Sequence, residues 1–400
     1  MSVTPRLVCT YAYYGAFIAL GLVVASLGPT LPGLAEQVGV PLSQISFLFA
    51  TRSSGYLIGT LICGRVYDHL PGHPILSGVM VLMAAAMAMV PFSDHLVLLA
   101  LVLFCIGVGE GTLDVGGNIL LVWNHPENLG PYMNGLHFCF GVGAFLSPIV
   151  VAQMMQITGT MTWAYGALAL LITPAALTFL LIRSPAIQKE NKQAKRQDGY
   201  TLYICLVAAC FFAFVGAEVG IGGWIYTYAV RQGLADETVS AYLTSGFWGA
   251  LTLGRLIGIP VAARVRPNVI LMADIAGAMG SVLLILIFPQ SVTILWLGTI
   301  GAGLFIASMF ATLLAFTERH IVITARVTGW FFAGSSLGAM SVPYLIGQFF
   351  ERVGPQVTLY AVLMDLVIAL FVFVILLFYA RRVAPHEGIT QAIPVPEPVP

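Results

Sequence analysis

The sequence predicts an all-α polytopic membrane protein with twelve transmembrane helices, arranged as two pseudo-symmetric six-helix bundles. Three observations predict this class: 59% of the residues are hydrophobic, only 8% are charged, and twelve apolar stretches follow one another along the chain. The mean hydropathy is +0.94. Because a soluble domain carries about 25% charged residues, a chain with so few charges cannot cover a water-facing surface, and we expect lipid to be its solvent.

Each apolar stretch is long enough to cross the hydrocarbon core, which takes about 20 helical residues. Short turns containing Pro, Gly or Asn separate the stretches. The expected spans are Leu7–Leu34, Ser43–Val66, Pro74–Phe92, Leu96–Trp123, Tyr132–Ile157, Trp163–Ile182, Tyr200–Val230, Val239–Ala263, Val269–Phe288, Ile294–Phe316, Val327–Phe350 and Leu359–Tyr379. The first is too long for the core of a signal peptide and is interpreted as a span.

One polar connector is much longer than the others and divides the chain nearly in half. We therefore expect an N-terminal six-helix bundle over residues 1–182, a cytoplasmic linker over 183–199 and a C-terminal six-helix bundle over 200–382. Residues 383–400 are rich in proline and are predicted to form a disordered cytoplasmic tail.

Lysine and arginine gather on one side of the predicted spans, and this bias predicts the orientation in the bilayer. The richer side receives Arg6, Arg65, Arg183, Lys189, Lys192, Lys195, Arg196, Arg264, Arg266, Arg319, Arg326, Arg381 and Arg382. The opposite side receives little beyond Arg52, Arg231 and Arg352. We therefore expect a multi-pass protein of the cell membrane with both termini in the cytoplasm.

Segments of the two halves resemble each other in residue type and spacing. Spans five and eleven repeat one pattern, Gly143-x4-Pro148-x4-Gln153 and Gly338-x4-Pro343-x4-Gln348. Span two with its loop likewise resembles span eight with its loop. Such duplication is typical of secondary transporters, in which the substrate lies between the halves near the membrane midplane.

The loop after span two contains the spacing Gly64-x3-Asp68-x3-Gly72. This spacing resembles the signature of the major facilitator superfamily, in which the Asp and the basic residues after it hold the cytoplasmic ends of the two halves together. The resemblance implies the major facilitator fold and a cytoplasmic gate at these three residues. His69 and His73 replace the usual Arg or Lys, which predicts a gate weaker than usual.

A narrower resemblance lies in spans four, five and seven. The segments Leu113-Asp-Val-Gly-Gly-Asn118 and Asn134-Gly-Leu-His-Phe-x-Phe140 look like those of the L-fucose–proton symporter family. The segment from Glu218 to Tyr228 is similar to that of the sodium-dependent glucose transporters in the same family. The fucose symporters pair the acid of span four with an acid in span one, whereas span one here has none before Glu36.

Span four carries Glu110, Asp114 and Asn118 at i, i+4 and i+8, so they share one helix face. A charge inside a span costs about 2.5–3.5 kcal/mol on insertion scales and marks a functional site by default. No Lys or Arg lies in the middle of span four or five, so we expect these acids to lack a permanent cationic partner. We interpret Asp114 and Glu110 as the coupling-ion site for H⁺ or Na⁺. The alternative is structural hydrogen bonding. Arg52 of span two either faces the same chamber or extends toward the membrane surface.

Candidate substrate ligands join Asn118 from three other spans. His137 of span five is a candidate sugar ligand, a protonatable group for coupling, or a helix-packing residue. Asn134 is either substrate-facing or merely at the helix start, and the resemblance adds Phe140. Tyr14 of span one and Gln44 of span two are predicted to line the cavity.

Span seven contains Glu218 among four glycines, followed by Trp224 and Tyr228. Glycines weaken a helix, and interrupted helices in transporters expose backbone groups to the substrate. Aromatic rings suit the apolar face of a sugar. We therefore predict an ion or substrate role for Glu218 and substrate contacts for Trp224 and Tyr228. The alternative is close glycine packing with an aromatic belt at the membrane surface.

These features predict a secondary active transporter that moves a neutral monosaccharide, a hexose by type, coupled to H⁺ or Na⁺ by alternating access. The spans lack the basic cluster that an anionic substrate requires. The alternative from the same acids is a proton-coupled exporter of drugs or other hydrophobic small molecules. A receptor that binds without transport is a third reading.

Other functions find little support in the sequence. There is no HExxH, GxSxG or nucleotide-binding loop, so we expect no enzyme activity. The formal net charge is zero, which argues against a nucleic-acid partner. The expected partners are the solute, the coupling cation and the lipid bilayer. No cofactor beyond H⁺ or Na⁺ is expected, and the architecture implies a monomer.

Overall fold

The structure is a computed structural model that describes residues 3–127, 129–186 and 200–381. Within these ranges the chain forms α-helices and one short 3-10 helix, η1. Their bounds are α1 Val3–Val24, α2 Leu27–Val38, α3 Leu42–Ile45, α4 Phe47–Tyr67, α5 Gly72–Met89, η1 Val90–Phe92, α6 Leu96–Asn124, α7 Leu129–Thr158, α8 Met161–Leu181, α9 Thr201–Arg231, α10 Glu237–Ala262, α11 Pro267–Ile287, α12 Val292–Ile306, α13 Met309–Glu318, α14 Ala325–Val353 and α15 Val357–Ala380. Most of the predicted linker and all of the predicted tail, 383–400, lie outside the described residues.

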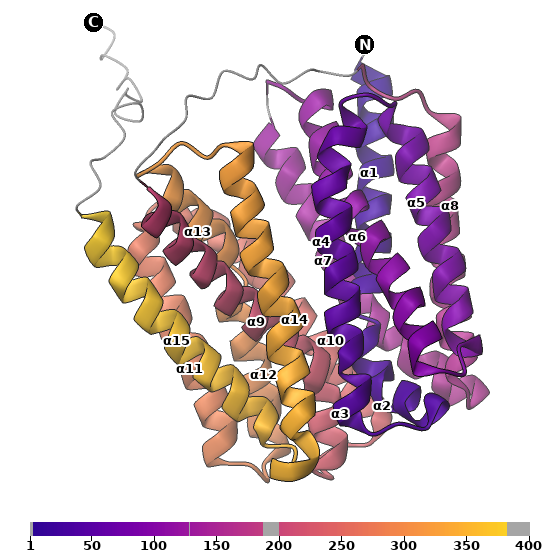
Figure 1. Cartoon of the computed structure of the whole chain (residues 1–400), viewed down its shortest axis with the longest axis vertical. Helices are drawn as coiled ribbons and strands as arrows, with labels where there is room; N and C mark the ends of the chain where they lie inside the picture. Colours follow the sequence, from indigo (N-terminus) through magenta and orange to yellow (C-terminus); the bar gives the residue numbers. More distant parts are fainter. Residues whose placement is uncertain (1–2, 128, 187–199, 382–400) are drawn as a thin grey trace, which may run out of the picture.

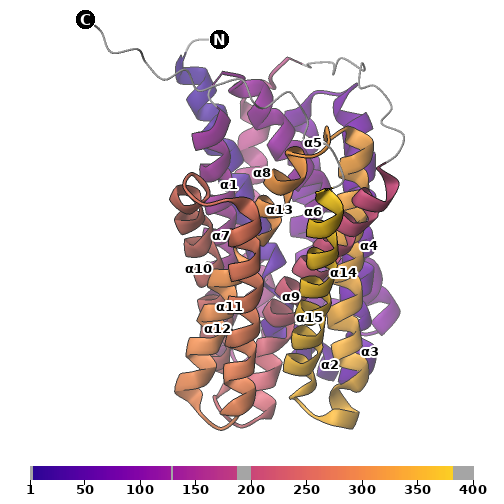
Figure 2. The same ribbon diagram turned by 90° about the vertical axis from the view of Figure 1, so that its left-hand side faces the viewer.

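These helices make the twelve passes that the sequence predicts, which confirms the fold class. Ten helical stretches in the described ranges are long and apolar enough to span a membrane. The other two passes, α10 and α14, have 26 and 29 residues and a more polar composition. In both views the helices run along the long axis of the molecule (Figure 1 and Figure 2).

Three of the passes consist of two consecutive α-helices: α1 with α2, α3 with α4, and α12 with α13. The break in the first pass falls at Ala25 and Ser26. Pro29 lies in the first turn of α2 and has no N–H, so it leaves the carbonyl of Ala25 without a helical donor. The sequence therefore interrupts the first span near the middle of its length.

Figure 1 shows α1 to α8 beside α9 to α15, with the start of α1 and the end of α15 at the same end of the molecule. The repeated glycines pack alike in the two halves. A Cβ atom on Gly143 of α7 would lie 2.0 Å from the carbonyl oxygen of Ile18 on α1. A Cβ atom on Gly338 of α14 would lie 1.9 Å from the carbonyl oxygen of Phe212 on α9. The duplicated sequence pattern therefore specifies the same close helix crossing twice.

The two halves are hydrogen-bonded to each other at the end where α2 leads into α3, which we call the far end. Gln153 of α7 donates to the hydroxyl of Tyr242 on α10 at 2.6 Å. Gln348 of α14 donates to the carbonyl of Ser43 on α3 at 2.5 Å, and Glu351 accepts from the backbone at the start of α3. These hydrogen bonds between the halves all lie at this end. The glutamine bonds, one from each repeat, form what we call the far-end latch.

Replacing both latch glutamines with leucine, in Q153L/Q348L, is expected to separate the halves at the far end. Each hydrogen bond contributes about 0.5–1.5 kcal/mol, so the loss of both shifts the conformational equilibrium by roughly five- to 150-fold. Spin labels on cysteines introduced at Asp94 and Gln290, both exposed at the far end, report the distance after replacement of the six native cysteines.

We expect the distance distribution of the double variant to gain a longer component. The matched control is Gln156→Leu, because Gln156 is exposed one turn beyond Gln153. A distribution in Q153L/Q348L that matches the control would show that the latch does not hold this end closed.

Candidate functional site

The site begins with a close crossing of α4 and α6. A Cβ atom on Gly107 of α6 would lie 2.0 Å from the carbonyl oxygen of Arg52, and one on Gly111 would lie 2.2 Å from that of Tyr56. Real Cβ atoms essentially never approach a heavy atom within 3.0 Å, so only glycine fits at both positions. The crossing places successive turns of α4 level with successive turns of α6.

Two polar pairs form across this crossing, one turn apart on both helices. Arg52 binds Glu110, and Tyr56 donates its hydroxyl to Oδ2 of Asp114 at 2.5 Å. The predicted acidic face of span four is therefore turned toward span two, and each acid has its own partner there.

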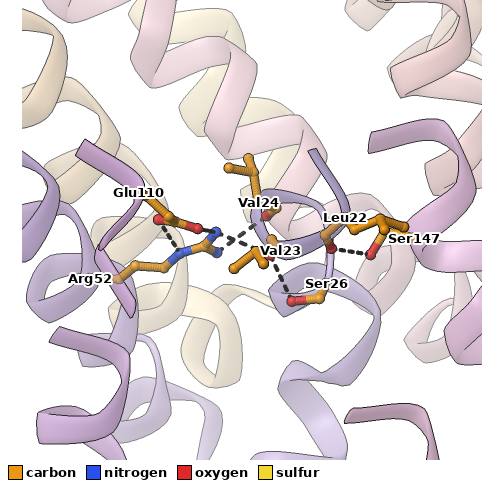
Figure 3. Close-up of polar contacts among 7 residues, drawn as sticks. All are labelled: Leu22, Val23, Val24, Ser26, Arg52, Glu110 and Ser147. Atoms are coloured by element: carbon orange, nitrogen blue, oxygen red, sulfur yellow. Dashed lines mark hydrogen bonds and ion pairs between the residues drawn. The ribbon is translucent and has the colours of Figure 1, made fainter. Parts of the chain in front are cut away.

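The Arg52–Glu110 pair is buried, with only 11% and 3% of the two side chains exposed. Arg52 donates through Nε to Oε2 of Glu110 at 3.0 Å and through Nη2 to Oε1 (Figure 3). The prediction that Glu110 lacks a permanent cationic partner is wrong, because Arg52 faces it from another helix. The reading in which Arg52 extends toward the membrane surface is also wrong. The case for Glu110 as an open ion site is lost with this pairing.

The same guanidinium caps the broken end of α1. Its Nη1 donates to the carbonyl of Val24 and its Nη2 to the carbonyl of Val23, both at 3.2 Å (Figure 3). The last carbonyls of a helix have no partner within the helix, and a cation near them is favourable. Two serine hydroxyls supply further bonds here, Ser26 to Val23 at 2.7 Å and Ser147 to Leu22 at 2.6 Å. Arg52 thus joins the break in span one to spans two and four.

Asp114 differs from Glu110 because its partners are neutral and it is partly exposed. Its Oδ2 accepts from Tyr56, and its Oδ1 accepts from Nδ2 of Asn118 at 3.1 Å. Asn118 also donates to the backbone carbonyl of Asp114 at 2.8 Å. The predicted pair Asp114 and Asn118 is therefore brought together, as the i, i+4 spacing requires.

Glu218 of α9 is paired with an arginine from another helix. Arg255 of α10 places Nη2 3.8 Å from Oε1 of Glu218, with 30% and 18% of the two side chains exposed. The guanidinium carbon of Arg255 also lies 5.8 Å from the ring centroid of Phe140 on α7, in the other half. This one side chain therefore links the candidate residues of the two halves.

The predicted ligands of spans one and five lie on the same face of the N-terminal half. His137 packs edge-on against Phe17, with ring centroids 6.0 Å apart. Asn134 is exposed one turn closer to the start of α7. The hydroxyl of Tyr14 donates to the backbone carbonyl of Tyr132 at 3.1 Å, so it is already used in helix packing.

Trp224 and Tyr228 do not line an accessible site in this conformation. Both are fully buried. The indole of Trp224 donates to the carbonyl of Pro343 at 3.0 Å and stacks on Phe350 with centroids 5.1 Å apart. Trp224 thereby joins α9 to α14. Because both rings are buried, the prediction that they contact the substrate is wrong for this conformation.

The expected interruption of span seven is also wrong, because α9 is continuous over 31 residues. Its glycines serve close packing instead: a Cβ atom on Gly223 would lie 2.7 Å from the ring of Phe49. Gln44 is exposed on the short helix α3 at the far end rather than beside Asp114. Its predicted place in the central cavity is therefore wrong.

The predicted gate residues Gly64, Asp68 and Gly72 surround the turn between α4 and α5. The N–H of Gly72 donates to the hydroxyl of Ser184 at 2.9 Å. His73, which stands where basic residues are usual, is fully buried and bonds the hydroxyl of Tyr13 through Nε2 at 2.8 Å. In this conformation, these contacts bind the turn to its own half of the protein.

Sequence reasoning gave Arg52 a place in the chamber as one alternative but missed its pairing with Glu110, and it missed Tyr56 and Arg255 entirely. A signal for two of them exists: Arg52 and Tyr56 repeat the i, i+4 spacing of Glu110 and Asp114. Both helices also carry glycines four residues apart, and such glycines indicate that two helices cross closely. For Arg255 the local sequence gives no comparable sign.

Twelve membrane passes in two halves, with charged side chains held where the halves meet, define a polytopic membrane transport protein. A model of the Major Facilitator Superfamily matches residues 13–322, and the chain belongs to this family. The resemblance seen in the sequence is thereby confirmed.

Three curated proteins show which members of the family this chain is similar to. The chain is 30% identical over 372 residues to sodium-dependent glucose transporter 1A of Mus musculus, covering 84% of this chain and 88% of the relative. It is 30% identical over 424 residues to sodium-dependent glucose transporter 1 of Danio rerio, covering 96% and 70%. It is also 25% identical to major facilitator superfamily domain-containing protein 4A of Homo sapiens, covering 95% and 93%.

Solved structures share the fold at low sequence identity. A bacterial homolog of the human lysosomal transporter Spinster, in an inward-facing and unoccupied conformation, superposes with a TM-score of 0.73 at 12% identity, covering 96% of this chain and 98% of that one. A nucleoside transporter superposes with a TM-score of 0.74 at 14% identity, covering 94% and 99%.

Proposed function

We propose that the protein is a secondary active transporter that moves a neutral monosaccharide, a hexose, together with one Na⁺ or H⁺ by alternating access. The sodium-dependent glucose transporters among its relatives support the substrate class and the use of a cation. The observation that carries the proposal is the charge balance of the helices that line the junction of the halves.

That balance leaves one negative charge uncompensated. The interiors of α4, α6, α9 and α10 carry two cations, Arg52 and Arg255, and three acids, Glu110, Asp114 and Glu218. Two positive and three negative charges sum to −1. Arg52 is paired with Glu110 and Arg255 lies beside Glu218, so the uncompensated charge is that of Asp114. One bound cation restores neutrality, so a neutral solute needs no further countercharge.

The accessible groups suit hydroxyl-rich solutes. Asp114, Asn118, His137 and Glu218 are all partly exposed and offer hydrogen-bond acceptors or donors. The ring of Phe140 supplies an apolar face beside them. In this proposal Asp114 binds the cation, and the amide, imidazole and carboxylate of the other three position the sugar.

In this proposal the far-end latch marks one state of the transport cycle. In the predicted orientation the termini are cytoplasmic, so the far end faces outward and is closed, and the site opens inward. We place the protein in the cell membrane as a monomer. Gly64, Asp68 and Gly72 then hold the cytoplasmic ends together in the opposite, outward-facing state.

Uptake by proteoliposomes tests this function. Purified protein is assayed with a panel of radiolabelled hexoses, pentoses and nucleosides, under Na⁺ and H⁺ gradients imposed separately. We expect a hexose to accumulate above its external concentration under one of the two gradients, and the accumulation to disappear when an ionophore removes that gradient. Vesicles that extrude hydrophobic dyes but take up no hexose would refute the proposal in favour of an exporter.

A further inference from the structure

Asp365 is an acid in the interior of α15, away from the junction of the halves. Only 5% of the residue is exposed, and its Oδ2 accepts no hydrogen bond among the described residues. The other two buried acids of the described ranges have partners: Arg52 binds Glu110, and Ser308 donates to Oδ2 of Asp274. Asp365 therefore differs from both, and the proposed transport cycle does not use it.

Asp365 packs directly against α9. A Cβ atom on Gly216 of α9 would lie 3.0 Å from Oδ2 of Asp365 and 2.7 Å from Cγ2 of Val342 on α14. One turn further along α9, a Cβ atom on Gly220 would lie 3.1 Å from Cγ2 of Val362, which precedes Asp365 by three residues on α15. The carboxyl group therefore lies in a close helix contact that glycine and valine otherwise form.

No charge from the surrounding helices compensates this carboxyl group. The helices packed against α15 are α9, α11 and α14. Glu218 of α9 lies about 200° around that helix from the glycine that contacts Asp365, and it faces Arg255. Asp274 of α11 is bonded to Ser308, and the charged residues of α14 lie in its first and last turns. Asp365 has no ion pair among the described residues, so a charge on it would be uncompensated.

A proton is the ligand that this environment suits. Burying an ionised carboxylate without a partner costs far more than burying the neutral acid, and an acid inside a span marks a functional site by default. A metal cation needs several oxygen ligands, whereas the neighbours here are glycine and valine. In the described part of the chain, no group of three or more His, Cys, Asp or Glu side chains could hold a metal ion.

We propose that Asp365 is a proton-binding site separate from the coupling-cation site, and that α15 packs on α9 as in this structure only while the proton is bound. The proton is not carried with the solute, and the neutral acid leaves the net charge of −1 at the junction unchanged. When the proton leaves, the carboxylate requires water or a donor, so the contact at Gly216 opens. Because α9 bears Glu218 on its opposite face, loosening this contact shifts a residue of the central site.

Infrared spectroscopy of proteoliposomes tests the proton directly. The carbonyl stretch of a protonated carboxyl group is separate from the bands of carboxylates and amides. At neutral pH we expect the wild-type protein to show such a band that Asp365→Asn lacks. The matched control is Asp94→Asn, which alters an exposed acid at the far end and should keep the band. A wild-type spectrum in Asp365→Asn would show that the acid is ionised and would overturn the inference.

The pH dependence of stability gives a second readout. While the folded protein keeps the proton and the unfolded chain releases it to water, the unfolding equilibrium constant rises about tenfold with each pH unit. Asp365→Asn and Asp365→Val bind no proton at this position. Between mildly acidic and alkaline pH, we therefore expect the thermal unfolding midpoint in detergent to fall less with pH in both variants than in wild type. A wild-type slope in either variant would contradict the proposal.

Exchange of hexose at equal pH on both sides tests whether the proton acts on the carrier. The packed form holds one proton more than the loosened form, so we expect exchange by the wild-type protein to fall as the pH rises, by up to about tenfold for each pH unit. Asp365→Asn is expected to lack this fall. The central acids are the same in both proteins, so their titration cancels in the ratio of the two rates. Parallel pH profiles would overturn the inference.

Only the exchange assay rests on the proposed function, because the infrared and unfolding measurements need no transported solute. Wild-type protein that takes up no hexose refutes the proposed function, and the proton site is then decided by the other two readouts. Wild-type protein that accumulates hexose, while Asp365→Asn keeps the wild-type spectrum, slope and pH profile, refutes only the role of Asp365.

Discussion

Asp114→Asn is expected to abolish cation-driven accumulation of hexose and to bring the internal and external concentrations to equality. The amide replaces the carboxylate with nearly the same shape, so it keeps the bond from Tyr56 but loses the charge that attracts a cation. Proteoliposomes with an imposed cation gradient measure the effect as a loss of at least about tenfold in accumulation, which corresponds to about 1.4 kcal/mol.

The reason for so large an effect is the charge balance at the junction. Without Asp114 the charges counted at the junction become two positive and two negative, and their sum is zero. The carrier then completes its cycle without a cation and equilibrates the sugar instead of concentrating it. Asp94→Asn is the matched control, because Asp94 is an exposed acid at the far end. Continued accumulation against the gradient by Asp114→Asn would end the coupling role of this residue.

Arg52→Met is expected to destabilise the protein more than any other substitution considered. It leaves Glu110 with 3% of its side chain exposed and no cation beside it. Removing one partner of a buried ion pair costs about 3–5 kcal/mol. The thermal unfolding midpoint in detergent should fall strongly, and transport should fall with it because the break in span one loses its cap.

The double variant R52M/E110Q separates the two contributions of this arginine. It removes the uncompensated charge, so we expect it to regain most of the stability that Arg52→Met loses. The carbonyls of Val23 and Val24 still lack their donors, and each lost bond costs about 1 kcal/mol. The double variant should therefore remain below wild type by about 1–3 kcal/mol. A double variant as unstable as Arg52→Met would contradict the charge argument.

The local parts of this structure could be predicted from sequence. Span lengths and the repeat follow from apolar runs and spacing, which are set within short stretches of chain. The pairing of Asp114 with Asn118 also follows, because residues four apart on a helix are neighbours. These features depend on the period of the helix and not on how helices pack.

The partners of the acids could not be predicted in this way, since they come from distant helices. Arg52 and Glu110 are 58 residues apart, and Arg255 approaches Glu218 from the next span. An intramembrane acid with no basic residue near it in the sequence can therefore still have a basic partner on another helix. The same limit explains Trp224, whose burial depends on the packing of α9 against α14.

The position of the helix break illustrates a competition between two local signals. Glycines in span seven favoured an interruption there, whereas Pro29 in span one removes a hydrogen bond outright. The glycines of α9 are compensated by helices that pack closely on them. Proline alone does not decide the outcome either, because α7 and α14 continue through Pro148 and Pro343.

Charge movement during uptake tests the charge balance most directly. Currents recorded from proteoliposomes on a solid-supported membrane, together with hexose uptake from the same preparation, give the number of charges moved per sugar. A net site charge of −1 predicts one positive charge per hexose, whether the cation is Na⁺ or H⁺. Hexose uptake with no accompanying current would contradict it.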